Sequence, residues 1–227
     1  MFIIPSKYTK KSPIFDCIDR IKKFHPNEKI LIIDSNSVDK SYFLKIKEID
    51  NVEVYDANNI NYEIGSLWYV YENKLNKNDE NFYLIQDGIL LNRNVDIMKD
   101  FEFCAFAYNE KHDGECLKYF DENFNNKSDY QILTDYFMVF GTCFFAKKTF
   151  LDKLNKKKVI SILPTYKLGS ECWERFIGNI AKQENINLVE NSLIHQNKLS
   201  ENGVYFLENG CEVYSNNFFD KVFCGRK

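Results

Sequence analysis

The chain has 227 residues, a formal net charge of −3, and a hydrophobic fraction of 44% that includes 20 Phe and 14 Tyr. This length fits one domain around a single core, and the apolar content excludes an intrinsically disordered chain. The longest basic run is Lys156–Lys158, so we expect no nucleic-acid partner. The apolar run Phe2–Ile4 is too short for a signal peptide or a transmembrane segment, which favours a cytoplasmic protein.

Seven cysteines are spread along the chain, and no two of them have the Cys-x-x-Cys spacing of many zinc sites. Because their number is odd and their spacing irregular, we expect scattered reduced thiols. We expect neither a disulfide framework nor a zinc site. The seven are Cys17, Cys104, Cys116, Cys143, Cys172, Cys211 and Cys224.

The first hundred residues alternate predicted strands with predicted helices. Ser12-Pro13 predicts a helix start with Ser12 as the N-cap, and apolar residues then follow at helical spacing. A later helix has an apolar face from Ile64 to Leu75. Gly65 lies near its start, where the missing side chain allows close packing or the close approach of a ligand. Short apolar or β-prone runs predict strands at residues 2–4, 29–33, 52–55 and 82–85.

Two acidic residues stand directly after predicted strands. Asp34 follows the second strand and Asp87 follows the central one, with Gly88 allowing a sharp turn. Open α/β sheets bind ligands at the carboxyl ends of their strands, so both carboxylates are candidates for ligand contact. Asp87 would hold a metal ion or the polar group that replaces one, and Asp34 would accept hydrogen bonds from a ring N–H or a ribose hydroxyl. Alternatively, Asp87 caps the next turn and Asp34 caps the following helix.

After residue 100 the alternation ends. A long apolar strand is predicted at Phe101–Tyr108, and the polar stretch Asn109–Tyr130 is typical of a binding loop or a mobile lid. Tyr136–Ala146 returns to the core with a bend at Gly141, and another strand is predicted at Ile186–Val189.

The last part of the chain predicts a hairpin and a basic tail. Asn209-Gly210 stands between two β-prone runs, which is a strong hairpin signal. The tail, Asn216–Lys227, ends in Arg226 and Lys227. It could fold back over a site and offer positive charge to a phosphate.

Three further titratable residues are candidates for chemistry. With Ser170 as a predicted N-cap, Glu171 and Glu174 lie in the first turn of a helix, where the helix dipole favours acids whatever their function. His195 follows an apolar pair, and a structural histidine and a metal ligand are both consistent with that position.

The order of these motifs resembles that of the GT-A class of glycosyltransferases, which use nucleotide-sugar donors. The resemblance is carried by FIIPSKY (Phe2–Tyr8), KILIIDSNSVD (Lys29–Asp39), FYLIQDG (Phe82–Gly88), FGTCFFAKK (Phe140–Lys148) and GSECWERFIG (Gly169–Gly178). It implies a single domain over residues 1–227, with a GT-A-like (Rossmann-like), mostly parallel α/β sheet flanked by helices, a C-terminal β-hairpin and a tail. Residues 1–100 would form the nucleotide-binding half and residues 101–227 the acceptor-binding half.

The resemblance also implies roles for the donor-side residues. Asp87 and His195 would bind Mn²⁺ or Mg²⁺, which prefers oxygen ligands and, as a Lewis acid, neutralises charge on the departing diphosphate. The residues expected to bind the nucleotide are Pro5, Ser6, Asp34, Gly65 and Gln86.

The catalytic residues implied by the resemblance are Glu171 and Glu174, one of which would deprotonate the acceptor hydroxyl. The chain departs from the family pattern at two places. The Asp-x-Asp motif reads Ile85-Gln86-Asp87, without its first acid, and the acidic pair reads Glu171-Cys172, with a thiol where the base usually stands. Either Glu171 or Glu174 has taken over as base, or the enzyme retains configuration by another route, or catalysis has been lost.

Three functions are consistent with the sequence. The first is a glycosyltransferase that moves a sugar from a UDP- or GDP-type donor to a glycan or glycoconjugate acceptor in glycan biosynthesis. The second is a catalytically silent sugar- or nucleotide-binding module of the same fold. The third is another nucleotide-binding α/β enzyme such as a nucleotidyltransferase, although the chain has neither a GxGxxG nor a GxxxxGK[ST] run.

Overall fold

The computed structural model describes residues 1–110, 122, 130, 133, 137–157 and 159–224. Most of the predicted binding loop or lid at Asn109–Tyr130, and both basic residues of the tail, Arg226 and Lys227, lie outside these ranges.

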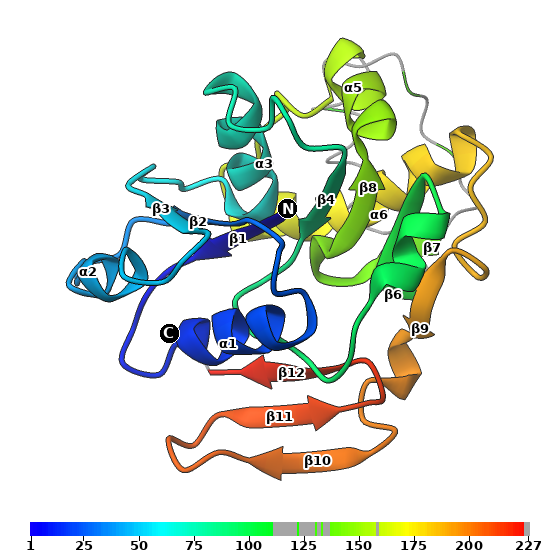
Figure 1. Ribbon diagram of the computed structural model, residues 1–227. Helices are drawn as coiled ribbons and strands as arrows, with labels where there is room; N and C mark the ends of the chain where they lie inside the picture. Colours follow the sequence, from blue (N-terminus) through cyan, green and yellow to red (C-terminus); the bar gives the residue numbers. More distant parts are fainter. Residues whose placement is uncertain (111–121, 123–129, 131–132, 134–136, 158, 225–227) are drawn as a thin grey trace.

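The main sheet is mixed, with strand order β3-β2-β1-β4-β8-β6-β7 and with β9 paired to β6 (Figure 1). The four strands predicted in the first hundred residues are confirmed, and they pair in parallel in the order β3-β2-β1-β4. The pairs β4–β8, β8–β6 and β6–β7 are antiparallel. The bounds are β1 (Phe2–Ser6), β2 (Ile30–Asp34), β3 (Val52–Tyr55), β4 (Asn81–Leu84), β6 (Phe103–Glu110), β7 (Phe137–Val139), β8 (Phe144–Lys147) and β9 (Ser192–His195).

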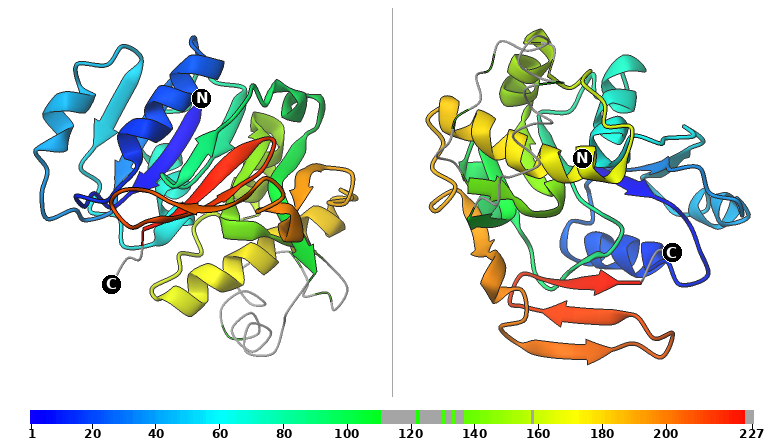
Figure 2. Two further views of the ribbon diagram at one scale, coloured as in Figure 1. Left: turned by 90° about the horizontal axis from the view of Figure 1, so that it is seen from below. Right: turned by 180° about the vertical axis from the view of Figure 1, so that it is seen from behind.

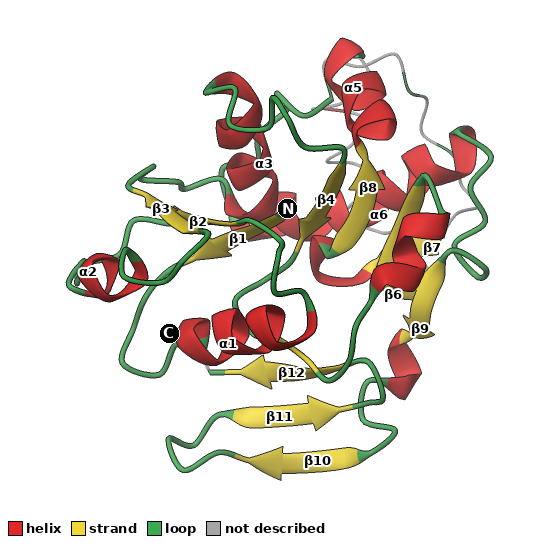
Figure 3. Ribbon diagram, viewed as in Figure 1, coloured by secondary structure: helices red, strands yellow, loops and turns green. Residues whose placement is uncertain are grey.

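Successive residues of the central strands point to opposite faces of this sheet, as the two-residue repeat of a strand requires. In β1, Ile3 packs with α3, α5 and α6, whereas Phe2 and Ile4 pack with α1 and α2. Helices therefore cover both faces, which explains why these strands are apolar throughout (Figures 2 and 3). The helices are α1 (Ile14–Phe24), α2 (Tyr42–Ile46), α3 (Tyr62–Glu72), α5 (Lys148–Lys156) and α6 (Lys167–Gln183), with short 3₁₀ turns at Asp96–Asp100, Phe140–Thr142 and Gln196–Lys198.

A second, antiparallel sheet packs on the α1 side, with the order β10 (Gly203–Phe206), β11 (Glu212–Ser215), β12 (Phe219–Phe223) and β5 (Ile89–Leu91). The predicted hairpin is confirmed as β10–β11, and Gly210 in its turn has φ of +79°. Strand β5 follows β4 after only four residues, so the chain passes from one sheet to the other at Ile85–Gly88.

Three local expectations were wrong. Helix α1 has Pro13, not Ser12, at its N-cap position, without a side-chain capping bond. Helix α6 begins at Lys167, so Glu171 lies beyond the first turn, which holds no acid. Residues 186–189 are irregular, and the strand that reaches His195 is β9.

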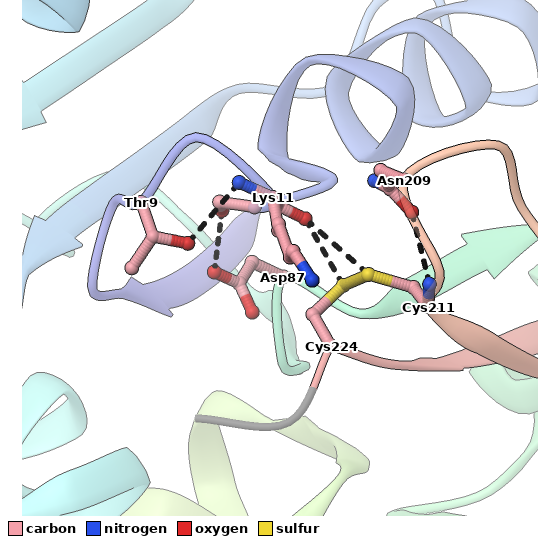
Figure 4. Close-up of a disulfide and its surroundings, with 7 residues drawn as sticks. Thr9, Lys11, Asp87, Asn209, Cys211 and Cys224 are labelled. Carbon is pink, nitrogen blue, oxygen red and sulfur yellow. Dashed lines mark hydrogen bonds between the residues drawn. A yellow bond between two sulfur atoms is a disulfide. The ribbon is translucent and has the colours of Figure 1, made fainter. Parts of the chain in front are cut away.

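The expectation of reduced thiols was wrong for two cysteines, because Cys211 and Cys224 form a disulfide (Figure 4). In the antiparallel register Glu212 lies opposite Phe223, which makes residues 211 and 224 the next facing pair. The carbonyl oxygen of Lys11 lies 3.0 Å from Sγ of Cys224. Four other cysteines are buried, and Cys116 lies outside the described residues: the four are Cys17, Cys104, Cys143 and Cys172.

None of the helices in the described ranges combines the length and apolar character that a membrane span requires.

The junction between the two sheets depends on Gly88. The Val222 amide donates to the Gly88 carbonyl at 2.8 Å, and a Cβ on residue 88 would lie only 2.6 Å from the Val222 carbonyl oxygen. The backbone of β12 therefore lies where any larger residue would place its side chain.

We expect Gly88→Ala to lower the free energy of unfolding by about 1–3 kcal/mol, because a backbone atom must move to relieve the clash. Urea denaturation measures the change. Gly210→Asn is the matched control, since nothing lies within 4 Å of its Cβ position and asparagine tolerates positive φ. Equal stability of Gly88→Ala and the wild type would contradict this account of the junction.

Candidate functional site

A cavity of about 300 Å³ opens beside the carboxyl ends of β1, β2 and β4. This is the edge at which open α/β sheets bind their ligands. Pro5 belongs to β1, Ser35 and Asn36 follow β2, and Gln86 follows β4. The complete lining is Pro5, Lys7, Ser35, Asn36, Asn59, Ile60, Tyr62, Glu63 and Gln86.

The backbone around this cavity adopts unusual conformations. Asn36, Asn58 and Tyr62 have φ of +60°, +45° and +57°, and two of the three line the cavity. Positive φ is tolerated by asparagine but is strained for a residue as large as tyrosine. Strained residues of this kind concentrate at ligand sites, where surrounding contacts hold them in place.

Asn59 holds one wall of the cavity in place. Its side-chain amide donates to the Tyr62 carbonyl at 2.7 Å and to the Ser66 hydroxyl at 3.0 Å. A Cβ on Gly65 would lie 2.2 Å from Oδ1 of Asn59. Of the two roles predicted for Gly65, the structure therefore shows close packing, which indirectly positions a residue of the cavity wall.

Gln86 links a cation and an anion at the cavity. Its side-chain oxygen accepts a hydrogen bond from Nζ of Lys221, and its nitrogen donates to Oε1 of Glu63 at 2.7 Å. The Ser170 hydroxyl donates to the other oxygen of Glu63 at 3.3 Å. The polar chain Lys221–Gln86–Glu63–Ser170 thus joins β12, the end of β4, α3 and α6.

Glu174 lies one helical turn beyond Ser170, close to Glu63. Burial of its carboxyl raises the pKa of Glu174 to about 8, and repulsion by the Glu63 carboxylate adds to the shift. Glu174 is therefore largely protonated at neutral pH. Glu171 differs, because its side chain is exposed and pairs with Lys167 at 3.4 Å on the surface of α6. The structure separates the two predicted catalytic acids and puts only Glu174 beside the cavity residues.

Asp87 lies inside the protein, with an exposed fraction of 2%. Its Oδ2 accepts hydrogen bonds from the hydroxyls of Ser6, at 2.9 Å, and Ser12, at 3.2 Å. Figure 4 shows Asp87 near the disulfide and beside the segment that joins β1 to α1, residues 7–13, which we call the Lys11 loop. The predicted N-cap Ser12 and the predicted nucleotide contact Ser6 are therefore both partners of Asp87.

Asp34 is fully buried as well. Oδ1 accepts from the Tyr42 hydroxyl at 2.6 Å and Oδ2 from the Ser37 amide at 3.0 Å. Burial, together with the Asp34 carboxylate, raises the pKa of Tyr42. Asp34 therefore shapes the turn that carries Ser35 and Asn36, two residues of the cavity wall.

The described residues around Asp87 do not fit a divalent-cation site. Mg²⁺ and Mn²⁺ need several oxygen ligands at once, including waters. Asp87 is instead enclosed with two hydroxyls that donate to it, and no group of three or more metal-binding side chains occurs within the described ranges.

His195 lies in another part of the fold. It ends β9, which is separated from β4 by β8 and β6, and it lines a different cavity of about 430 Å³. Its Nδ1 accepts a hydrogen bond from the Asn197 amide at 3.2 Å. The described structure does not bring the two expected metal ligands, Asp87 and His195, to one site.

Glu63 and Lys221 are site residues that were not predicted from the sequence. Glu63 stands in the first turn of α3, where an acid is unremarkable. Lys221 could have been found only by predicting β12 and its pairing with β5, which places it opposite Ile89.

Comparisons with known proteins give little identification. No family model and no curated protein matches the chain. A solved structure with detectable similarity is that of S. aureus TarS, residues 1–349. The two sequences are 12% identical, and the structural match has a TM-score of 0.37. The match covers 68% of this chain and 48% of the TarS chain, so this chain spans about half the length of TarS 1–349. At this similarity the match identifies no family and carries no functional argument.

The raised pKa of Glu174 makes a prediction about stability. Between pH 4.5, the ordinary value, and about 8, the folded protein keeps a proton that the unfolded chain loses. Stability is therefore lost as the pH rises through this window, by up to about 1.4 kcal/mol per pH unit. Glu174→Gln removes this loss, so its stability relative to the wild type should increase from pH 5 to pH 8.

Urea denaturation at pH 5, 6.5 and 8 measures the difference. Glu171→Gln, on the surface of the same helix, is the control for removing a carboxylate from α6, and its difference should change less with pH than that of Glu174→Gln. A pH-independent difference for Glu174→Gln would contradict the raised pKa.

Proposed function

We propose that this protein is a glycosyltransferase that binds a UDP- or GDP-type nucleotide-sugar donor in the cavity at the carboxyl ends of β1, β2 and β4. The observation that carries this proposal is the position of the cavity at the ligand edge of a doubly covered α/β sheet, with Pro5 and Gln86 in its wall. Its volume of about 300 Å³ suits part of a small-molecule ligand.

The chemistry of the lining supports a nucleotide. Tyr62 offers an aromatic surface for a base, and the amide of Asn36 offers donors and an acceptor for polar ring edges. Lys7 brings an exposed ammonium to the same wall, which suits phosphate. Residues 1–100 would form the nucleotide-binding half.

Transfer requires a base for the acceptor hydroxyl. The acceptor oxygen bonds to the anomeric carbon, the bond from that carbon to the diphosphate oxygen breaks, and the hydroxyl proton passes to a carboxylate. We assign this role to Glu63, because it lines the cavity and Glu174 holds its own proton at neutral pH. Glu174 would act as a positioning residue behind it, and the acceptor, a glycan or glycoconjugate, would be bound by residues 101–227.

We propose a cytosolic location, as expected from the sequence. The disulfide is more typical of an oxidising compartment. Fractionation of cells that express the full chain would decide between the two.

We expect the wild type to bind UDP or GDP and to release it from a nucleotide sugar in the presence of a glycan acceptor mixture. Ser35→Trp should abolish nucleotide binding, because the indole fills the cavity. Asn217→Trp, in the wall of the separate cavity near His195, is the matched control and should bind normally. Isothermal titration calorimetry measures binding, and thermal unfolding checks that both variants fold.

Two outcomes would count against the proposal. A folded Ser35→Trp variant with wild-type affinity would exclude this cavity as the donor site. Stabilisation by free glycans, without binding of any nucleotide, would favour the catalytically silent binding module.

A further inference from the structure

Lys221 is a buried cation. Its exposed fraction is 5%, although lysine is among the residues least often buried. Its ammonium donates to the side-chain oxygen of Gln86, which is a neutral partner, and lies 5.5 Å from the centroid of the Phe223 ring. Burying a charge is costly unless an opposite charge compensates it.

No carboxylate of the described residues lies within 4.0 Å of this ammonium, so it has no ion pair there. The neighbouring acid, Asp220, points away because successive strand residues face opposite sides of the sheet. Asp220 accepts instead from Ser215 at 2.6 Å and from Asn92 at 2.8 Å. Glu63 is reached only through the amide of Gln86.

The pairing of β12 with β5 places Lys221 near the carboxyl end of β4, at the edge of the main sheet where the cavity opens. In the β12–β5 pairing, Lys221 lies opposite Ile89, next to Gly88. Its Nζ lies 3.9 Å from the position that a Cβ on Gly88 would occupy. The ammonium therefore lies beside the turn after β4, where it reaches Gln86, a residue of the cavity wall.

We propose that Lys221 and Gln86 form a metal-independent binding site for the diphosphate group of the donor, in which the buried ammonium supplies the positive charge. This inference rests on the proposed function for the identity of the anion. The phosphate oxygens provide the negative charge that no described carboxylate supplies to the ammonium by an ion pair. Lys7, in the cavity wall that also contains Gln86, supplies a second cation. The poor fit of Asp87 to a divalent cation agrees with this division of roles.

A site of this kind has a recognisable signature. Lys221→Met keeps the length of the side chain and removes the buried charge, so the free variant should be at least as stable as the wild type. The same substitution should weaken anion binding by roughly ten- to a hundredfold, the loss expected for one charge-assisted hydrogen bond. A lysine with only a structural role would show the reverse, with lower stability and unchanged binding.

The test uses the full chain in EDTA, with inorganic pyrophosphate, UDP and GDP as probes in calorimetry, and with thermal unfolding of each free protein. The wild type should bind pyrophosphate and one of the two nucleotides without metal, and Lys221→Met should bind both weakly. Lys198→Met is the control, because this exposed lysine lines the separate cavity near His195. Its binding should equal that of the wild type.

The outcomes separate this inference from the proposed function. Nucleotide-sugar turnover that requires Mn²⁺ or Mg²⁺, with no binding in EDTA, overturns the lysine site and leaves the glycosyltransferase standing. Unchanged binding by Lys221→Met also overturns it. Metal-free pyrophosphate binding that is lost in Lys221→Met, without turnover of any nucleotide sugar, supports the anion site and overturns the glycosyltransferase.

Discussion

The buried carboxylate of Asp87 joins three segments that are distant in sequence. It accepts hydrogen bonds from Ser6 at the end of β1 and from Ser12 in the loop before α1, while Asp87 itself follows β4. Removing a partner from a buried carboxylate is costly, so these bonds fix how the loop lies over the sheet edge. Pro5 and Lys7, which line the cavity, are the sequence neighbours of Ser6, so this cluster adjoins the cavity wall.

The second constraint is the contact between the two sheets. Gly88 allows the backbone of β12 to come within hydrogen-bonding distance of the turn after Asp87. The main sheet provides Gln86 and the second sheet provides Lys221, so the polar site exists only where both sheets meet. The disulfide between Cys211 and Cys224 fixes the far end of β12 beside the Lys11 loop.

The parallel part of the fold could be predicted because its information is local. The apolar runs of β1 to β4 and the helical spacing of α1 and α3 each identify their own element. The positions of Asp34 and Asp87 after predicted strands indicated which edge of the sheet binds ligands. The contacts of these two carboxylates could not be predicted, because a sequence does not show which hydroxyls surround a buried carboxylate. Lys221 and the disulfide depend on the register of β12 against β5 and β11, which are long-range pairings without a local signal.

The pairing of β5 with β12 has a consequence for the order in which the protein matures. Residues 89–91 of β5 are synthesised long before residues 219–223 of β12. The backbone edge of β5 that pairs with β12 therefore stays unpaired while the intervening residues are made. Contacts between such distant segments form late in folding. The parallel strands β1 to β4 can therefore assemble early, but Lys221 reaches Gln86 only when β12 pairs with β5.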